Sequence, residues 1–199
     1  MVRIFLGFVL GLLILPIVAF VYIHHGHPPV AVADQPFPME RQIAHAVLNQ
    51  RIDAEAPAKA LAEANEATFI AGAHIYREQC AFCHGLSGQP SNVGKNIFPD
   101  APPLWEKHHH GDVVGVSDDP PGETYWKVAN GIRLTGMPAY KSFLTETQMW
   151  QVTILLANAD KPLPPAALAI LKEPLSLDIP TAAIPTAPSA VKPAKPAAK

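Results

Sequence analysis

The sequence is poor in cysteine, in charge and in basic residues. Two cysteines among 199 residues exclude a disulfide framework and a four-cysteine zinc or iron–sulfur site. Charged residues make up only 16% of the chain, and 15 basic against 17 acidic residues give a net charge of −2. This balance excludes a protein that binds nucleic acid through a basic face, so we expect no nucleic-acid partner. The 22 prolines predict long segments that are neither helix nor central strand.

One long apolar segment lies near the N-terminus. Residues 4–23, IFLGFVLGLLILPIVAFVYI, contain no charged side chain. As a helix they would span the ~30 Å hydrocarbon core of a bilayer. Arg3 precedes the segment and no Lys or Arg follows before Arg41, so the positive-inside rule predicts that residues 1–3 are cytoplasmic and the remainder is exported. We therefore expect a single-pass transmembrane anchor that contacts membrane lipid through residues 4–23.

A cleaved signal peptide is the alternative interpretation of this segment. Ala31-Val32-Ala33 has the small-x-small form of a cleavage site. That site is far from the apolar run, however, and the run is longer than the ~7–15 residues of an export signal. The sequence favours an anchor, and both interpretations export the remainder of the chain.

Composition divides the exported part into three segments. Residues 24–65 are expected to be a partly helical spacer, and residues 66–161 carry the motifs and most of the aromatic residues of a folded domain. Residues 162–199 are dominated by Pro, Ala and Lys and lack aromatic residues. We expect this last segment to be a flexible tail.

Two short stretches outside the folded domain favour helix, and a third could dock on it. Residues 39–48 have Ile43, Val47 and Leu48 on one side, and residues 54–66 are rich in alanine. Within the tail, residues 168–171 are apolar enough to dock locally. None of these stretches carries a chemical motif.

The segment Cys80-Ala81-Phe82-Cys83-His84 has the form C-x-x-C-H, which marks attachment of a c-type haem. Two thiols at this spacing can each form a thioether to one of the two vinyl groups of a porphyrin. His84 then faces the iron and becomes its proximal ligand. We predict one haem c, bound covalently through Cys80 and Cys83.

Two other kinds of site share part of this pattern. A thioredoxin-like C-x-x-C site would need a βαβ context, which the sequence lacks, and would not require His84. A zinc site would need further ligands, and the chain has no second cysteine pair. Haem attachment is therefore the favoured interpretation.

The second axial ligand is predicted to be Met137, in the segment Gly136-Met137-Pro138. A thioether is soft and neutral and suits ferrous iron, and Gly136 and Pro138 predict a loop that cannot continue as a helix. The run His108-His109-His110 is the alternative and would give bis-histidine ligation. Met149 lies in a predicted helix, where methionine usually fills the core.

These segments together resemble the class I cytochromes c. The resemblance rests on five segments: Gly72 to Cys80, Cys80 to His84, Ala101-Pro102-Pro103-Leu104, Asn130 to Tyr140, and Leu144 to Ala157. It implies a small all-α domain around one covalent haem, beside the one N-terminal transmembrane helix. It also implies that a backbone carbonyl, of Pro102 or alternatively Pro103, accepts the Nδ1 proton of His84. The N-terminal helix of the domain would cross the C-terminal one at Gly72.

Local signals support the C-terminal helix independently and predict one more helix. Thr145-Glu146-Thr147-Gln148 is a capping-box pattern, and apolar residues recur at helical spacing after it. A middle helix is expected over residues 123–130, after Pro120-Pro121-Gly122 and before Gly131. Four side chains are candidates for lining the haem pocket: Trp105, Trp126, Arg133 and Tyr140.

The predicted function is electron transfer and not catalysis. His84 and Met137 together would leave no open position on the iron, and no acid–base or nucleophilic constellation stands out elsewhere in the sequence. The resemblance and the export signal imply a monohaem carrier of single electrons on the periplasmic side of a bacterial inner membrane. Its partners would be membrane redox proteins. A fixed cytochrome subunit of a larger oxidoreductase complex is the alternative.

The charge pattern departs from that of lysine-rich relatives. Residues 66–161 contain seven basic and ten acidic residues. Docking to a partner through a ring of lysines is therefore not expected.

Overall fold

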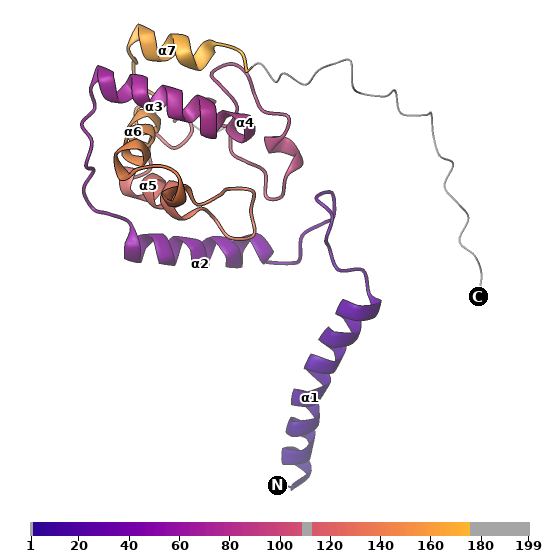
Figure 1. Ribbon diagram of the computed structural model, residues 1–199. Helices are drawn as coiled ribbons and strands as arrows, with labels where there is room; N and C mark the ends of the chain where they lie inside the picture. Colours follow the sequence, from indigo (N-terminus) through magenta and orange to yellow (C-terminus); the bar gives the residue numbers. More distant parts are fainter. Residues whose placement is uncertain (1, 109–112, 176–199) are drawn as a thin grey trace, which may run out of the picture.

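The computed structural model describes residues 2–108 and 113–175 (Figure 1). His109 and His110 of the histidine alternative, and residues 176–199 of the predicted tail, lie outside the described residues. The described part contains seven α-helices, two short 3-10 helices and no strand. The α-helices are α1 (Val2–His25), α2 (Glu40–Glu55), α3 (Glu66–Gln79), α4 (Ala81–His84), α5 (Pro121–Asn130), α6 (Glu146–Leu156) and α7 (Pro165–Lys172), and the 3-10 helices are η1 (Gly94–Asn96) and η2 (Tyr140–Ser142). The predicted all-α fold is confirmed.

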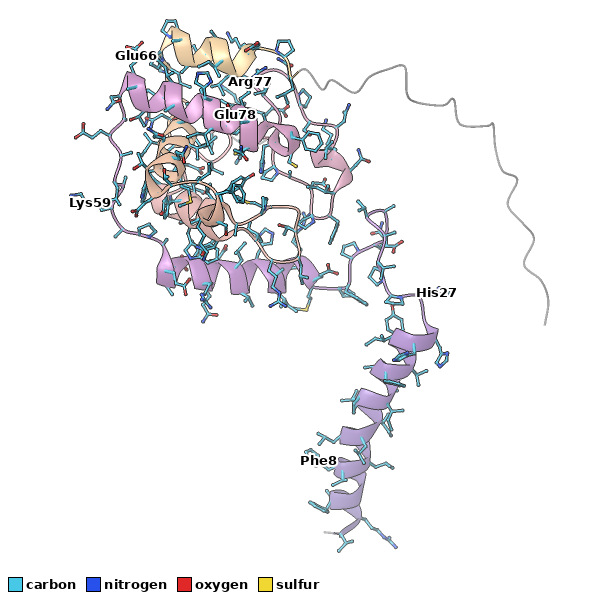
Figure 2. The ribbon with its side chains drawn as sticks, in the orientation of Figure 1. Phe8, His27, Lys59, Glu66, Arg77 and Glu78 are labelled. Carbon is cyan, nitrogen blue, oxygen red and sulfur yellow. The ribbon has the colours of Figure 1, made fainter. Side chains whose placement is uncertain are left out.

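Helix α1 extends the predicted apolar segment by two residues at each end and stands apart from the other helices (Figure 1). Its side chains, Phe8 among them, project from the helix without a covering neighbour (Figure 2). Among the described residues, α1 alone is long and apolar enough to cross a bilayer, a test that a signal sequence near the N-terminus also passes.

The core of the domain is built on the crossing of α3 and α6. The capping box predicted at the start of α6 is present, with Thr145 and Gln148 bonded reciprocally. The helices meet where Gly72 faces Gln151, and a Cβ at position 72 would lie 2.5 Å from the Gln151 carbonyl oxygen. Only glycine lets the two backbones come this close, so the predicted crossing at Gly72 is confirmed.

Replacing Gly72 with alanine is therefore expected to lower the free energy of unfolding by about 1–3 kcal/mol, the usual cost of overpacking. The clash is with backbone atoms of α6, which cannot move away as a flexible side chain would. Denaturant unfolding of the haem-loaded chain measures the effect. His74→Ala, at an exposed position on the same helix, is the control and should change stability by less than about 0.5 kcal/mol. Equal stability of the two variants would contradict this interpretation of the crossing.

Helix α7 corrects the predicted boundary of the tail at residue 162. It packs on α3 and buries Leu163, Ala167 and Leu171. These residues recur every four positions, and Pro165 occupies the first turn, where its missing N–H costs nothing. The high Pro and Ala content of residues 162–199 led to the prediction of a tail, although these three buried residues have helical spacing. The folded part of the chain therefore continues through α7. The local docking expected for residues 168–171 is one part of this longer contact.

Arg77 of α3 binds the C-terminal end of α7. Its guanidinium donates hydrogen bonds to the carbonyl oxygens of Ile170 at 3.3 Å, of Pro174 at 2.8 Å, and of Glu173. Figure 2 shows Arg77 on α3 beneath α7. The C-terminal end of a helix has carbonyl oxygens without intrahelical partners and favours positive charge. The Arg77 side chain therefore both caps α7 and connects it to α3.

If α7 belongs to the folded domain, Leu171→Ala should cost about 2–4 kcal/mol of stability, because its side chain is completely buried. Lys172→Ala, on the exposed side of the same turn, should cost less than about 0.5 kcal/mol. Denaturant titration of both variants, followed by circular dichroism, measures the difference. A tail without tertiary contacts would make the two variants alike.

The spacer is also part of the folded body. Helix α2 is longer than the helix predicted over residues 39–48, and it packs on α5 through Ile52. The Trp126 indole donates a 3.1 Å hydrogen bond to Glu55 and lowers the pKa of that carboxyl. The helix ends at Glu55 because Pro57 disfavours helical backbone at Ala56, which is extended. The helix-permissive interpretation of residues 54–66 was therefore wrong between α2 and α3.

Candidate haem-binding site

The two motif cysteines and His84 lie on one turn of helix that continues α3. Cys80 links the end of α3 to α4, which contains Cys83 and His84. Gly85 ends the turn with φ +74°, a conformation that favours glycine. The buried Tyr76 hydroxyl donates a 2.7 Å hydrogen bond to the Gly85 carbonyl and so fastens α4 to α3. No pattern in the sequence predicted this bond of Tyr76.

The hydrogen bond of His84 fixes which ring nitrogen is free. Its Nδ1 lies 2.8 Å from the Pro102 carbonyl oxygen, and since a carbonyl can only accept, Nδ1 carries the proton. Nε2 therefore keeps its lone pair. Burial lowers the pKa of His84, which favours the neutral imidazole that binds metals. The prediction that Pro102, and not Pro103, accepts this proton is confirmed.

The environment of the cysteines opposes a thiol redox site. Cys80 and Cys83 are not joined by a disulfide. Burial, and to a lesser degree the neighbouring Cys83, raises the pKa of Cys80 to about 12. Dithiol oxidoreductases need the opposite shift, because the thiolate is the nucleophile. Among the described residues, no three side chains of His, Cys, Asp or Glu gather in a way that could hold a metal ion.

The segment that contains Met137 returns to the cysteine turn. The Tyr140 hydroxyl donates a 2.6 Å hydrogen bond to the Gln79 carbonyl, next to Cys80. Burial raises the pKa of Tyr140 to about 12, with smaller contributions from the nearby Cys80 and Cys83. Met137 itself is partly buried against the core.

The Met137 loop has little backbone freedom. The Met137 N–H donates to Thr135 Oγ1 at 3.1 Å, and its carbonyl accepts from the Ile132 N–H at 3.2 Å. The Thr135 hydroxyl in turn donates to the Ile132 carbonyl at 2.7 Å. These bonds fix the backbone of the loop itself, while the Tyr140–Gln79 hydrogen bond connects the segment that follows it to the end of α3.

Trp105 provides a test of whether these residues fit a bound group. Its ring packs edge-on against Tyr76, with centroids 5.5 Å apart. Its indole Nε1 is buried near the Tyr76 side chain but makes no hydrogen bond of standard geometry among the described residues. A buried donor without an acceptor is costly, and a cofactor with carboxylate substituents, such as haem, would supply one. The free Nε2 of His84, the cysteine pair and this donor fit haem c.

Other candidate residues lie elsewhere. Trp126 faces Glu55 of α2 and does not line the site, and Arg133 is exposed. Met149 is 4% exposed within α6 and fills the core, as predicted. His108 is the one residue of the histidine run that the structure describes, and its side chain is exposed. The ligand roles of Cys80, Cys83, His84 and Met137 stay predictions.

Comparison with protein families decides the class of the domain. A family model described as "Cytochrome C oxidase, cbb3-type, subunit III" matches residues 67–154. These residues form a c-type cytochrome domain. The match begins in α3 and ends in α6, so the cytochrome domain includes the C-x-x-C-H turn and the Met137 loop. A cytochrome domain of this type implies covalent haem c and electron transfer. Comparisons with curated proteins and with solved structures gave no match.

Proposed function

We propose that this chain is a membrane-anchored monohaem cytochrome that carries single electrons between respiratory partners on the periplasmic side of a bacterial inner membrane. The observation that carries the proposal is one cytochrome domain with a single haem-attachment motif, connected to one apolar helix of 24 residues. Arg3 before the helix, and the lack of Lys or Arg until Arg41, support an N-terminus in the cytoplasm.

Four residues would hold the cofactor. Cys80 and Cys83 would attach the haem c, His84 would bind the iron through the Nε2 that its bond to Pro102 leaves unprotonated, and Met137 would be the second ligand. With His84 and Met137 both bound, the iron would have no position for a substrate, and the cofactor would supply outer-sphere electron transfer. Imidazole with thioether raises the reduction potential above that of a bis-histidine site.

A second candidate function is a fixed cytochrome subunit of a larger membrane oxidoreductase. The description of the matching family, a subunit of an oxidase complex, favours it. Helix α1 would then contact neighbouring subunits as well as lipid. Both functions use the same haem site. They differ in whether other membrane proteins stay bound to the chain.

Purification of the full chain from native membranes in a mild detergent distinguishes the two functions. A carrier is expected as a particle of one chain with one haem, which titrates as a one-electron couple. Integral proteins that co-purify in a fixed ratio would instead support the subunit. A chain recovered without α1, or in the soluble fraction, would contradict the anchor in both cases.

A further inference from the structure

Helix α2 has two different faces. One face packs on the cytochrome domain, where Ile52 is 1% exposed, Leu48 is half-buried one turn earlier, and Glu55 bonds Trp126. These contacts fix the rotation of α2 about its own axis. The residues on the opposite face of α2 therefore point away from the cytochrome domain.

That opposite face is apolar and uncovered. Met39, Ile43 and Val47 recur every four residues and are 64%, 58% and 62% exposed. At ~100° per residue, Ile43 lies about 180° round the helix from the buried Ile52. The arc between Met39 and Val47 also holds Ala54 and a single polar side chain, Gln50. We call Met39, Ile43 and Val47 the apolar stripe, and no described residue covers it.

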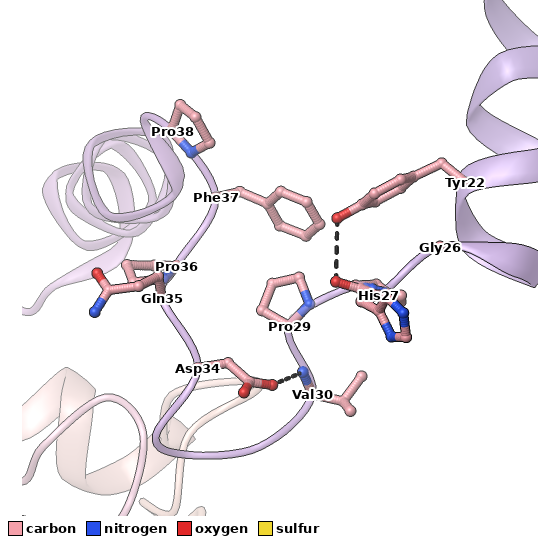
Figure 3. Close-up of a pocket in the computed structure, with 11 residues that line it drawn as sticks. Tyr22, Gly26, His27, Pro29, Val30, Asp34, Gln35, Pro36, Phe37 and Pro38 are labelled. Carbon is pink, nitrogen blue, oxygen red and sulfur yellow. Dashed lines mark hydrogen bonds between the residues drawn. The ribbon is translucent and has the colours of Figure 1, made fainter. Parts of the chain in front are cut away.

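The chain between α1 and α2 places the start of the stripe beside the end of the apolar span. The Phe37 ring lies against Tyr22, in the last turns of α1, with centroids 6.3 Å apart (Figure 3). Asp34 accepts 2.8 Å hydrogen bonds from the Val30 and Ala31 N–H groups, and Glu40 accepts one from Phe37. The connection is thus a folded turn and not an open tether. Tyrosine at the end of a span typically lies at the membrane interface.

The arrangement of the helices points the stripe towards the membrane. In Figure 1, α2 lies between α1 and the cytochrome helices, and its axis runs across that of α1. The side of α2 that packs on α5 faces the cytochrome domain. The stripe on the other side therefore faces the region from which α1 enters a bilayer.

We propose that the apolar stripe of α2 rests on the outer surface of the lipid bilayer, at the boundary between headgroups and acyl chains. The proposal rests on the proposed function, because it needs α1 as an anchor. Helix α2 would be an interfacial helix that holds the cytochrome domain in one orientation above the membrane. The covalent link to α1 makes this contact intramolecular, so that a stripe of three side chains is sufficient.

The charges of α2 determine what kind of lipid contact this is. The helix carries two arginines against three acidic residues, Glu40, Asp53 and Glu55. Attraction to anionic headgroups is therefore not the driving force, and burial of apolar surface is. The contact should form on uncharged phosphatidylcholine and persist at high salt.

The stripe can be tested by placing one label on each side of α2. Val47→Cys puts a thiol on the stripe, and His45→Cys puts one at an exposed position about 160° away on the same helix. In the haem-loaded full chain, Cys80 and Cys83 are consumed by the cofactor, so each variant has one reactive thiol. A fluorescent nitrobenzoxadiazole label is attached, and the wild-type chain treated in parallel gives the background.

The labelled chains are reconstituted into phosphatidylcholine vesicles with and without bromine on the acyl chains, and vesicle flotation is measured first. Brominated lipid is expected to reduce emission at position 47 about two-fold, since an interfacial helix buries its apolar face ~5–10 Å deep. Emission at position 45 should hardly change, and high salt should not alter the difference.

The outcomes separate the stripe from the anchor. Chains that float with the vesicles but show equal quenching at both positions would overturn the stripe alone. The stripe would also be overturned if neither aqueous iodide nor brominated lipid quenched the label at position 47. A protein segment or a second chain would then cover that position. Chains that do not float would overturn the anchor and the stripe together.

Discussion

Replacing Cys83 with alanine is expected to leave the chain with little or no covalently bound haem. Cys83 and Cys80 lie on one continuous helical turn, and removal of one sulfur leaves a porphyrin vinyl group without its thioether. The sulfur that remains, on Cys80, can form only one of the two thioethers. Haem staining after denaturing electrophoresis, together with the intact mass of the chain, measures the loss.

The matched control is Phe82→Ala, within the same turn. The Phe82 side chain is 51% exposed and contributes no sulfur, so the variant should retain one haem per chain. Full covalent incorporation of haem in Cys83→Ala would contradict our interpretation of the motif. Loss of haem in both variants would show that the turn had failed to fold.

Replacing Met137 with alanine is expected to abolish the long-wavelength band of thioether-to-iron coordination in the ferric spectrum. The variant should also bind carbon monoxide in its reduced form, since one axial position becomes open, and its reduction potential should fall. The cost in folding should be moderate, because the loop is also held by Thr135 and Ile132. Absorption spectroscopy and a redox titration measure these changes.

Met149→Leu is the matched control, because it removes a methionine from the core of α6 at nearly constant volume. Its ferric spectrum should be that of the wild-type chain. An unchanged long-wavelength band in Met137→Ala would reject Met137 as the ligand. A spectrum of bis-histidine type in the wild-type chain would instead favour the run at His108–His110.

Local signals in the sequence predicted the core of the cytochrome domain well. The capping box at Thr145 marks the start of α6, and Pro120 and Pro121 mark the start of α5, which begins at Pro121 and not at the predicted residue 123. Gly72 predicted the helix crossing for a similar reason, because two backbones that approach this closely require glycine at the contact. The C-x-x-C-H spacing is equally local, and haem c followed from it directly.

The two segments that flank the domain could not be predicted in the same way. Arg77 caps α7 across more than ninety residues of sequence, and Trp126 meets Glu55 across 71. Such contacts depend on tertiary structure and leave no local pattern. In α2, positions 43 and 52 are both isoleucine, yet Ile43 is exposed and Ile52 is buried. Composition alone therefore suggested a spacer and a tail where the chain forms docked helices.

The most direct test of the central claim is the mass of the mature chain purified from membranes under denaturing conditions. We expect the polypeptide plus one haem, and, after proteolysis, a haem-bearing peptide that contains Cys80, Cys83 and His84. A chain without an added tetrapyrrole, in which both thiols react with an alkylating reagent, would contradict the haem site and the electron-transfer function that depends on it.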